Sequence, residues 1–495
     1  MTATVHKRFL SSIFGNALKS AIAFLSGIFL ARALGPDDFG RMLFLGGIFL
    51  AFKQLFDPGI STAFFTFNAR RLRGKKFITT YFCWIAIQLI ISISLIAFLL
   101  PESIIYLIWR DNSRELIILA LIATYIQTVF WSTLVQLSES QKQTYLIQKV
   151  GLITSVVNIT LLFGAYYLKY LDLKFVFIII IIEWTFASVF TLSRIKFRVS
   201  KYGNIESLIF FKNYKNKYLL FVPYTIISIF YDFIERWLLQ KYGGNTQQAF
   251  YGIAFQIASI SAVATSACVN IYWKEIADAK ILKNFKYVQD LYTKTTKNLM
   301  LLTISISAFI YPWLNEIISI LLGNDYVEGA EVLGIMLFFP LLQSFSQMGT
   351  TTFYAYEKIK IQSLVGILYM FISIIITYIF TAPQSAYIPG FNLGAWGFAL
   401  KTVLIQVLVV STSLYLLSKK LKILFEYKSL LSIGVFCIAF GFLSKLVALN
   451  IFLTNSTYIN LFLSGLIFSI LLFVSISFFP KVFGFYKRDL FFYKI

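Results

Sequence analysis

The stretch KYLLFVPYTIISIFYDFIERWLLQK, residues 217–241, poses the problem that the fold must solve. It has the length of a helix that crosses a bilayer, yet it carries Asp232, Glu235 and Arg236 within about one and a half turns. Placing each charged group at that depth costs about 2.5 to 3.5 kcal/mol, so this helix is expected to face protein or water. Asp232 and Arg236 are one turn apart and can neutralise each other, whereas Glu235 needs another partner. The cluster therefore has two interpretations, a functional site or a self-paired structural group.

The composition of the whole chain is that of a membrane protein. Of its 495 residues, 58% are hydrophobic and 13% are charged, and the mean hydropathy is +0.77. The apolar blocks are too long for ordinary core helices, and they lack the alternation that is typical of an outer-membrane barrel. The sequence therefore predicts an all-α polytopic membrane protein.

Windows of twenty residues predict about fourteen membrane-spanning helices. They cover residues 12–34, 41–66, 78–99, 114–136, 149–168, 175–193, 218–240, 249–271, 298–321, 331–352, 362–381, 394–417, 429–448 and 459–479. Loops rich in Lys and Arg, such as ARRLRGKK at 69–76, alternate with loops nearly free of them, such as GPDDFG at 35–40. By the positive-inside rule both termini are expected to be cytoplasmic. The net charge of +22 then anchors the inner loops to anionic lipid, and no nucleic-acid partner is expected.

Two pairs of segments suggest an internal repeat. LARALGPDDFGRMLFLGGIF (30–49) and LLQKYGGNTQQAFYGIAFQIA (238–258) align Gly40 with Gly252, and two later segments align Gly151 with Gly366. Six helices duplicated in parallel orientation are a common plan of transporters. The expected organisation is an N-terminal six-helix bundle, a basic cytoplasmic linker, a C-terminal six-helix bundle, and two peripheral helices with a cytoplasmic tail, at residues 1–193, 194–217, 218–417 and 418–495 respectively.

Four basic residues at helix depth are candidates for a cationic path: Lys19, Lys53, Arg236 and Lys401. A guanidinium can bind phosphate oxygens in pairs, and a lysine acts as a point charge. Two of the four have local alternatives. Lys53 can pair with Asp57 one turn later, and Lys19 can extend its ammonium to the cytoplasmic interface.

Glu183, in the middle of IIIIIEWTF, is the most isolated charge in the sequence. A carboxylate at that depth can exchange an ion with a cavity, so Glu183 is a candidate for coupling to a proton or sodium gradient. The three cysteines lie in apolar blocks and the chain has one histidine, so we expect no metal site and no cofactor. No catalytic group of residues is expected either.

The same segments carry a family likeness. LARALGPDDFG followed by FDPGISTAFFTFNARR resembles the opening of polysaccharide-export flippases of the O-antigen type, in the multidrug/oligosaccharidyl-lipid/polysaccharide exporter superfamily. FYGIAFQIA (250–258), LLGNDYVEGAEVLGIMLF (321–338) and GFNLGAWGFALKTVLIQ (390–406) are similar to later parts of that family, so the likeness covers roughly the whole chain. It implies two bundles around a V-shaped cavity that opens to each side in turn. It also implies transport of polyprenyl (undecaprenyl) diphosphate-linked oligosaccharides to the outer leaflet of the bacterial inner membrane.

The sequence thus predicts a flippase whose substrate path includes Arg236, Lys401, Lys19 and Lys53. Glu183, Asp232 and Glu235 are expected to serve ion coupling or structural pairing. The membrane potential favours outward movement of the diphosphate by about 2.3 kcal/mol per charge per 100 mV. No GxxxxGK[ST] loop for ATP is present.

Two alternatives remain open. One is a cation-coupled multidrug exporter of the same superfamily, which would need acidic residues to dominate the cavity. The other is a membrane-bound polysaccharide polymerase, which the short outer loops disfavour. The expected partners are the lipid bilayer and the lipid-linked glycan, and polysaccharide assembly enzymes are candidates for docking on the basic inner loops.

Overall fold

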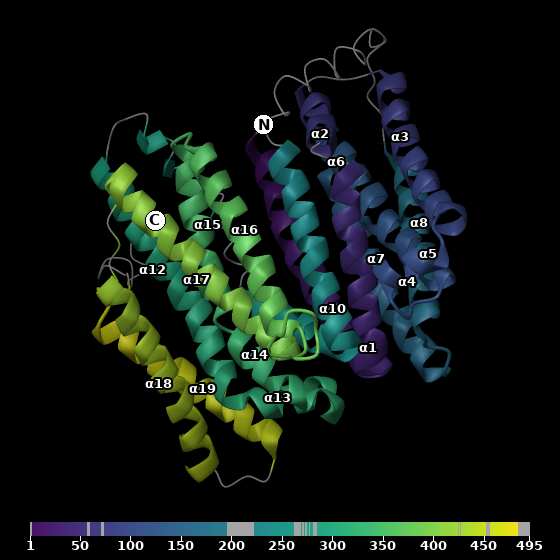
Figure 1. The fold of residues 1–495 in the computed structure, drawn as a ribbon. Helices are drawn as coiled ribbons and strands as arrows, with labels where there is room; N and C mark the ends of the chain where they lie inside the picture. Colours follow the sequence, from purple (N-terminus) through teal and green to yellow (C-terminus); the bar gives the residue numbers. More distant parts are fainter. Residues whose placement is uncertain are drawn as a thin grey trace. The chain divides into compact units, whose positions relative to one another are not determined.

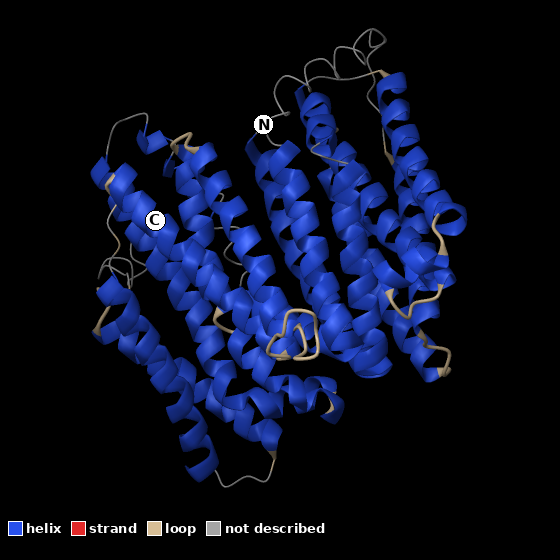
Figure 2. Ribbon diagram, viewed as in Figure 1, coloured by secondary structure: helices blue, strands red, loops and turns tan. Residues whose placement is uncertain are grey.

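A computed structural model of the chain describes residues 2–56, 60–70, 74–195, 222–261, 269, 272, 275–276, 278–280, 285–423, 425, 427–451 and 456–483. All regular elements in these ranges are helices (Figure 2). The prediction of an all-α fold is confirmed. Two compact units divide the chain, Met1–Ala249 and Phe250–Ile495.

The helices of the two units follow one another with short connections (Figure 1). Those of the first unit are α1 (Thr2–Phe56), α2 (Ile60–Arg70), α3 (Lys75–Ser94), η1 (Leu95–Leu99), α4 (Glu102–Trp109), α5 (Arg114–Tyr125), η2 (Ile126–Phe130), α6 (Trp131–Ser140), α7 (Thr144–Tyr167) and α8 (Leu173–Arg194). The helix α10 (Val222–Ala258) crosses the boundary between the units. Those of the second unit are η3 (Ser259–Ser261), α12 (Phe285–Ile310), η4 (Tyr311–Trp313), α13 (Leu314–Leu322), η5 (Asn324–Gly329), α14 (Ala330–Met336), α15 (Phe339–Ala355), α16 (Ile359–Thr381), α17 (Gly394–Leu421), α18 (Tyr427–Ile451) and α19 (Thr457–Phe478).

Eleven helices in the described part of the chain are long and apolar enough to cross a membrane. One of them, Gly15–Gln54, contains the first two expected spans, and α10, which holds the seventh and the start of the eighth, is not among the eleven. Each of the fourteen expected spans therefore corresponds to described helix over at least part of its length. The chain is a multi-pass membrane protein.

Glycine hinges divide both of the double-length helices. The backbone of Gly35 in α1 has φ 75° and ψ 173°, and that of Gly244 in α10 has φ 76° and ψ −170°. A positive φ of this kind strains residues with a side chain and is readily adopted by glycine. The two hinges occupy equivalent places in the repeat. They align Gly35 with Gly244, and hence Gly40 with Ala249 and not with Gly252 as the sequence suggested.

The second pair of aligned segments has the same backbone geometry at both copies. Lys142 (φ 62°) and Glu357 (φ 59°) each end a helix in the left-handed conformation. Each turn is closed by the hydrogen bonds of a Schellman motif: Gln143 N to Ser138 O and Lys358 N to Phe353 O, both 2.8 Å, and Lys142 N to Glu139 O and Glu357 N to Tyr354 O, both 3.0 Å. This register is the one that aligns Gly151 with Gly366. The structure thus supports the internal repeat.

The first half of α10 packs against the second half of α1 within the first unit. Gly40 lies so close to the Asn245 backbone that a Cβ at this position would overlap it, and Asn245 Nδ2 donates to Asp37 Oδ1 at 2.9 Å. The sequence assigned this part of α10 to the second bundle. The boundary at 217/218 stays a prediction, and most of the linker 194–217 lies outside the described residues.

A proline break in the first unit is closed by a cation. Pro101 has no N–H, so the carbonyl of Ala97 loses its helical donor. Arg114 replaces it, with Nη1 2.6 Å from Ala97 O, and Nη2 donates to Leu100 O at 3.0 Å and to Glu102 Oε1 at 2.7 Å. Arg114 thus satisfies the end of one helix and the acid that begins the next.

The second unit repeats this break at Pro312 but closes it with α18. Lys445 of α18 donates to Pro312 O at 2.7 Å and to Glu316 Oε1 at 2.6 Å. Trp313 Nε1 donates to Ser464 Oγ of α19 at 3.1 Å. Gly441 lies against the carbonyl of Ala308, the group that Pro312 leaves without a donor. The two C-terminal helices, expected to be peripheral, are therefore bonded into the second unit.

The Lys445 contact predicts a stability change. Lys445→Met keeps the aliphatic stem but leaves the Pro312 carbonyl and Glu316 without this donor, and we expect a loss of about 1–3 kcal/mol in the free energy of unfolding. Lys174→Met is the matched control, because Lys174 and Glu115 are also 2.6 Å apart but more exposed. It should cost less than about 1 kcal/mol. Denaturant or thermal unfolding of the purified protein in detergent measures both, and equal losses would contradict the assignment.

Candidate functional site

The charged residues of α10 lie on different sides of that helix. Arg236 is exposed and rests on Gly47 of α1, where an added Cβ would be 2.5 Å from Nη1 of Arg236. Glu235 is buried, and Asp232 is half-buried and within electrostatic range of both neighbours. Glycine at 47 therefore provides the space in which the guanidinium lies along α1.

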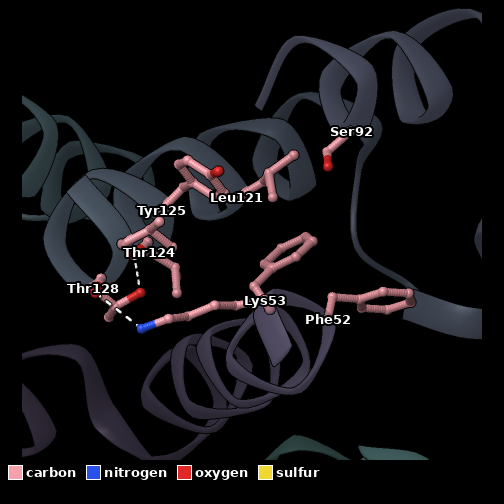
Figure 3. Close-up of a pocket in the computed structure, with 9 residues that line it drawn as sticks. Phe52, Lys53, Ser92, Leu121, Thr124, Tyr125 and Thr128 are labelled. Atoms are coloured by element: carbon pink, nitrogen blue, oxygen red, sulfur yellow. Dashed lines mark hydrogen bonds between the residues drawn. The ribbon is translucent and has the colours of Figure 1, made fainter. Parts of the chain in front are cut away.

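Lys53, near the end of α1, is held by an irregular turn of another helix. Its Nζ donates to the backbone carbonyl of Thr128 at 2.9 Å, as Figure 3 shows. Thr128 belongs to η2, a π-turn in the middle of the membrane span Arg114–Ser140. Single π-turns inside α-helices are frequent at functional sites. The alternative partner, Asp57, lies outside the described residues.

Lys19 is half-buried at the crossing of α1 with α7. Gly151 of α7 makes room for it, because a Cβ there would be 3.3 Å from Lys19 Cδ and 3.6 Å from Nζ. Glu139 is close enough to interact with it electrostatically. Lys19 thus lies between helices of the first unit and has an acidic neighbour.

Glu183 is enclosed in the first unit and 6% exposed. Asn158 Nδ2 of α7 lies 2.9 Å from both Oε1 and Oε2 of Glu183. Both residues line a cavity of about 280 Å³ formed by α1, α5, η2, α7 and α8. Ser26, Thr124, Gln127 and Ser155 add further polar groups to its wall. The cavity has the size and the oxygen and amide groups to hold water or a small cation next to the carboxylate.

Lys401 is in the second unit, in α17, and is 1% exposed. Its Nζ lies 4.1 Å from the centroid of the Phe398 ring, which is a cation–π contact. The ammonium is thus surrounded by protein in this structure. A role for Lys401 in the substrate path stays a prediction.

The sequence did not identify two features of this site. Asn158, the donor to Glu183, is a polar residue within the apolar span 149–168, and that isolation was the available signal. The π-turn that binds Lys53 has no signal in the sequence, because its register depends on how α5 packs. Of the predicted residues, Lys19, Lys53, Glu183, Asp232, Glu235 and Arg236 all lie in the first unit.

The Glu183 contact can be tested by a double-mutant cycle. Asn158→Leu removes the donor and leaves a buried carboxylate, so it should lower the free energy of unfolding by about 1–3 kcal/mol. In a Glu183→Leu background the same substitution should cost clearly less, because no carboxylate remains. Thermal unfolding in detergent supplies the four values, and strict additivity would show that the two side chains do not depend on each other.

Comparison with solved structures found a similar fold in transporters. The lipid II flippase MurJ, in an inward closed conformation, matches with a TM-score of 0.67 and 16% sequence identity, over 96% of this chain and 99% of that chain. An inward-facing MATE family multidrug resistance transporter of the MOP superfamily matches with a TM-score of 0.62 and 15% identity, over 82% and 96% of the chains. A MOP superfamily transporter from Pyrococcus furiosus matches with a TM-score of 0.53 and 14% identity, over 83% and 94%.

No protein-family model matches the sequence, and no curated protein matches it. At 14–16% identity the structural matches establish the fold. The chain is a multi-pass membrane protein with the fold of the MOP superfamily transporters.

Proposed function

We propose that this protein is a flippase that moves a polyprenyl diphosphate-linked oligosaccharide, such as an O-antigen repeat unit, from the cytoplasmic to the outer leaflet of a bacterial inner membrane. The observation that carries the proposal is the extent of the structural match. MurJ, a lipid II flippase, covers 96% of this chain, whereas the MATE transporter covers 82%. The uncovered 4% is shorter than α18 and α19 together, so the flippase has a counterpart for at least part of these helices.

The charges of the first unit support an anionic substrate. A diphosphate cannot enter the bilayer core without compensating charge, and its oligosaccharide needs hydrogen-bonding groups. Arg236 is exposed, and Lys53 and Lys19 are half-buried. In this proposal Arg236 binds phosphate oxygens, Lys19, Lys53 and Lys401 contribute positive charge, and Asp232 and Glu235 fix the orientation of α10. Both termini face the cytoplasm, so the membrane potential assists outward movement.

Ion coupling is assigned to Glu183. Its cavity is lined by amide and hydroxyl groups and lies apart from Arg236, so a proton or sodium ion can bind there without competing for the substrate site. The multidrug exporter is the second candidate, favoured by the match to the MATE transporter.

Sidedness of the lipid-linked oligosaccharide tests the function. Cells that lack the protein should retain it on the cytoplasmic face, and the wild-type gene should restore outward transfer. Arg236→Ala should reduce the transfer rate about tenfold, equivalent to roughly 1.4 kcal/mol, and Arg236→Lys should retain more activity because it keeps the charge. Normal transfer in the deletion strain, combined with greater drug sensitivity, would favour the exporter. Full activity of Arg236→Ala would remove Arg236 from the path and leave the flippase in place.

The coupling role of Glu183 has its own test. In vesicles that hold the purified protein, an imposed proton or sodium gradient should accelerate flipping by the wild type. Glu183→Gln preserves the shape and the hydrogen bond to Asn158 but cannot ionise, so its flipping rate should not respond to the gradient. Glu183→Asp, which keeps the charge, is the control. An undiminished response in Glu183→Gln would exclude this residue as the coupling site.

A further inference from the structure

The wall between Glu183 and Lys53 is a single helix turn. Thr124 lines the Glu183 cavity, and it also lines a second cavity of about 20 Å³ in which Lys53 lies (Figure 3). The second cavity has room for about one water molecule. Thr124 is 9% exposed and directly precedes the last residue of α5. The carboxylate and the ammonium are therefore on opposite sides of one segment, Ala123–Thr128.

Hydrogen bonds join the two sides through that segment. Lys53 Nζ donates to Thr128 O at 2.9 Å, and Thr128 Oγ1 donates to Thr124 O at 2.6 Å. The N–H of Trp131 donates to the carbonyl of Ile126, which is the i to i+5 pairing of a π-turn. This pairing displaces the usual i to i+4 bonds, so carbonyls in the turn can accept from a side chain. Lys53 stabilises the π-turn in this way.

Glu183 and Lys53 attract each other across this wall. Among the described residues that line the two cavities, they are the charged ones. Charges inside a protein interact more strongly than in water, because the effective dielectric constant is lower. An ionised Glu183 therefore helps to hold the ammonium on Thr128, and a Glu183 neutralised by a proton or a bound cation holds it less.

We propose that the charge on Glu183 controls whether the Lys53 ammonium stays on the π-turn or turns away to meet the diphosphate of the substrate. Neutralisation of Glu183 weakens the attraction and releases Lys53, and the phosphate then takes the place of the Thr128 carbonyl as its partner. Thr124 and the π-turn act as the coupling element between the ion site and the substrate path. The identity of the anion rests on the function proposed above, whereas the link between Glu183 and Lys53 does not.

The link is measured without substrate, by the chemical reactivity of Lys53. The full-length protein in vesicles of phosphatidylethanolamine and phosphatidylglycerol is reductively methylated with formaldehyde and cyanoborohydride, and mass spectrometry compares Lys53 with Lys445 of the other unit as an internal standard. Glu183→Gln should raise the relative rate at Lys53 about threefold or more, because the retaining charge is lost. Asn158→Asp adds a carboxylate to the same cavity and should lower the rate. Glu183→Asp should remain near the wild type.

A second measurement shows whether the effect passes through the π-turn. Hydrogen exchange of the amides between Ile126 and Ser132 should increase in Glu183→Gln, because Lys53 leaves the Thr128 carbonyl. Lys53→Met should increase it as well, and Glu183→Gln should have no further effect in the Lys53→Met background.

Two results would overturn the proposal. One is the same Lys53 reactivity in the wild type, Glu183→Gln and Asn158→Asp. The other is an effect of Glu183→Gln on exchange that persists without Lys53. Either result would leave the flippase function standing, and absence of flipping by the wild type would overturn that function while leaving the link intact.

Discussion

A backbone carbonyl that loses its helical donor inside a bilayer must find another one, and the architecture of this protein depends on that constraint. The described chain meets it with cations at three irregular turns. Arg114 serves the break before Pro101, Lys445 serves the break at Pro312, and Lys53 serves the π-turn at Thr128. Charges that are costly in a membrane are thus placed where they satisfy polar groups that are equally costly.

The two proline breaks show how duplicated halves can diverge in one detail. In the first unit the cation comes from Arg114, which begins the next helix of the same bundle. In the second unit it comes from Lys445 on α18, a helix with no counterpart in the six-helix repeat. This difference explains why the C-terminal helices are part of the second unit: its broken helix depends on them for a donor. The same dependence gives α18 and α19 a structural role that is independent of any contact with substrate.

The π-turn differs from the proline breaks because no proline fixes it. Arg114 and Lys445 donate to carbonyls near prolines, and a proline keeps its missing N–H under all conditions. The carbonyl of Thr128 can recover a helical partner if the turn changes its register, so the Lys53 contact is the reversible one of the three. A reversible contact next to a buried carboxylate is suited to ion coupling, whereas the two permanent ones are suited to stability.

Much of the fold could be predicted from the sequence, and less of the site. Hydropathy and the alternation of basic loops fixed the helical class and the positions of the spans, because the cost of exposing polar backbone to lipid depends on local composition. The residues Arg236, Lys53 and Glu183 were recognisable as charges at bilayer depth for the same reason. Their neighbours were not, since Gly47, Asn158 and Thr128 are set by which helices touch and in what register.

The sequence by itself therefore determined that this is a membrane protein of duplicated helices with charges buried in its spans. Only the tertiary structure decided that Gly35 and Gly244 are equivalent hinges, that Lys445 closes a broken helix, and that Glu183 and Lys53 lie on either side of one π-turn. Hydrophobic periodicity is a property of neighbouring residues along the chain. The pairing of a cation with a carbonyl on another helix is a property of packing, which no local pattern records.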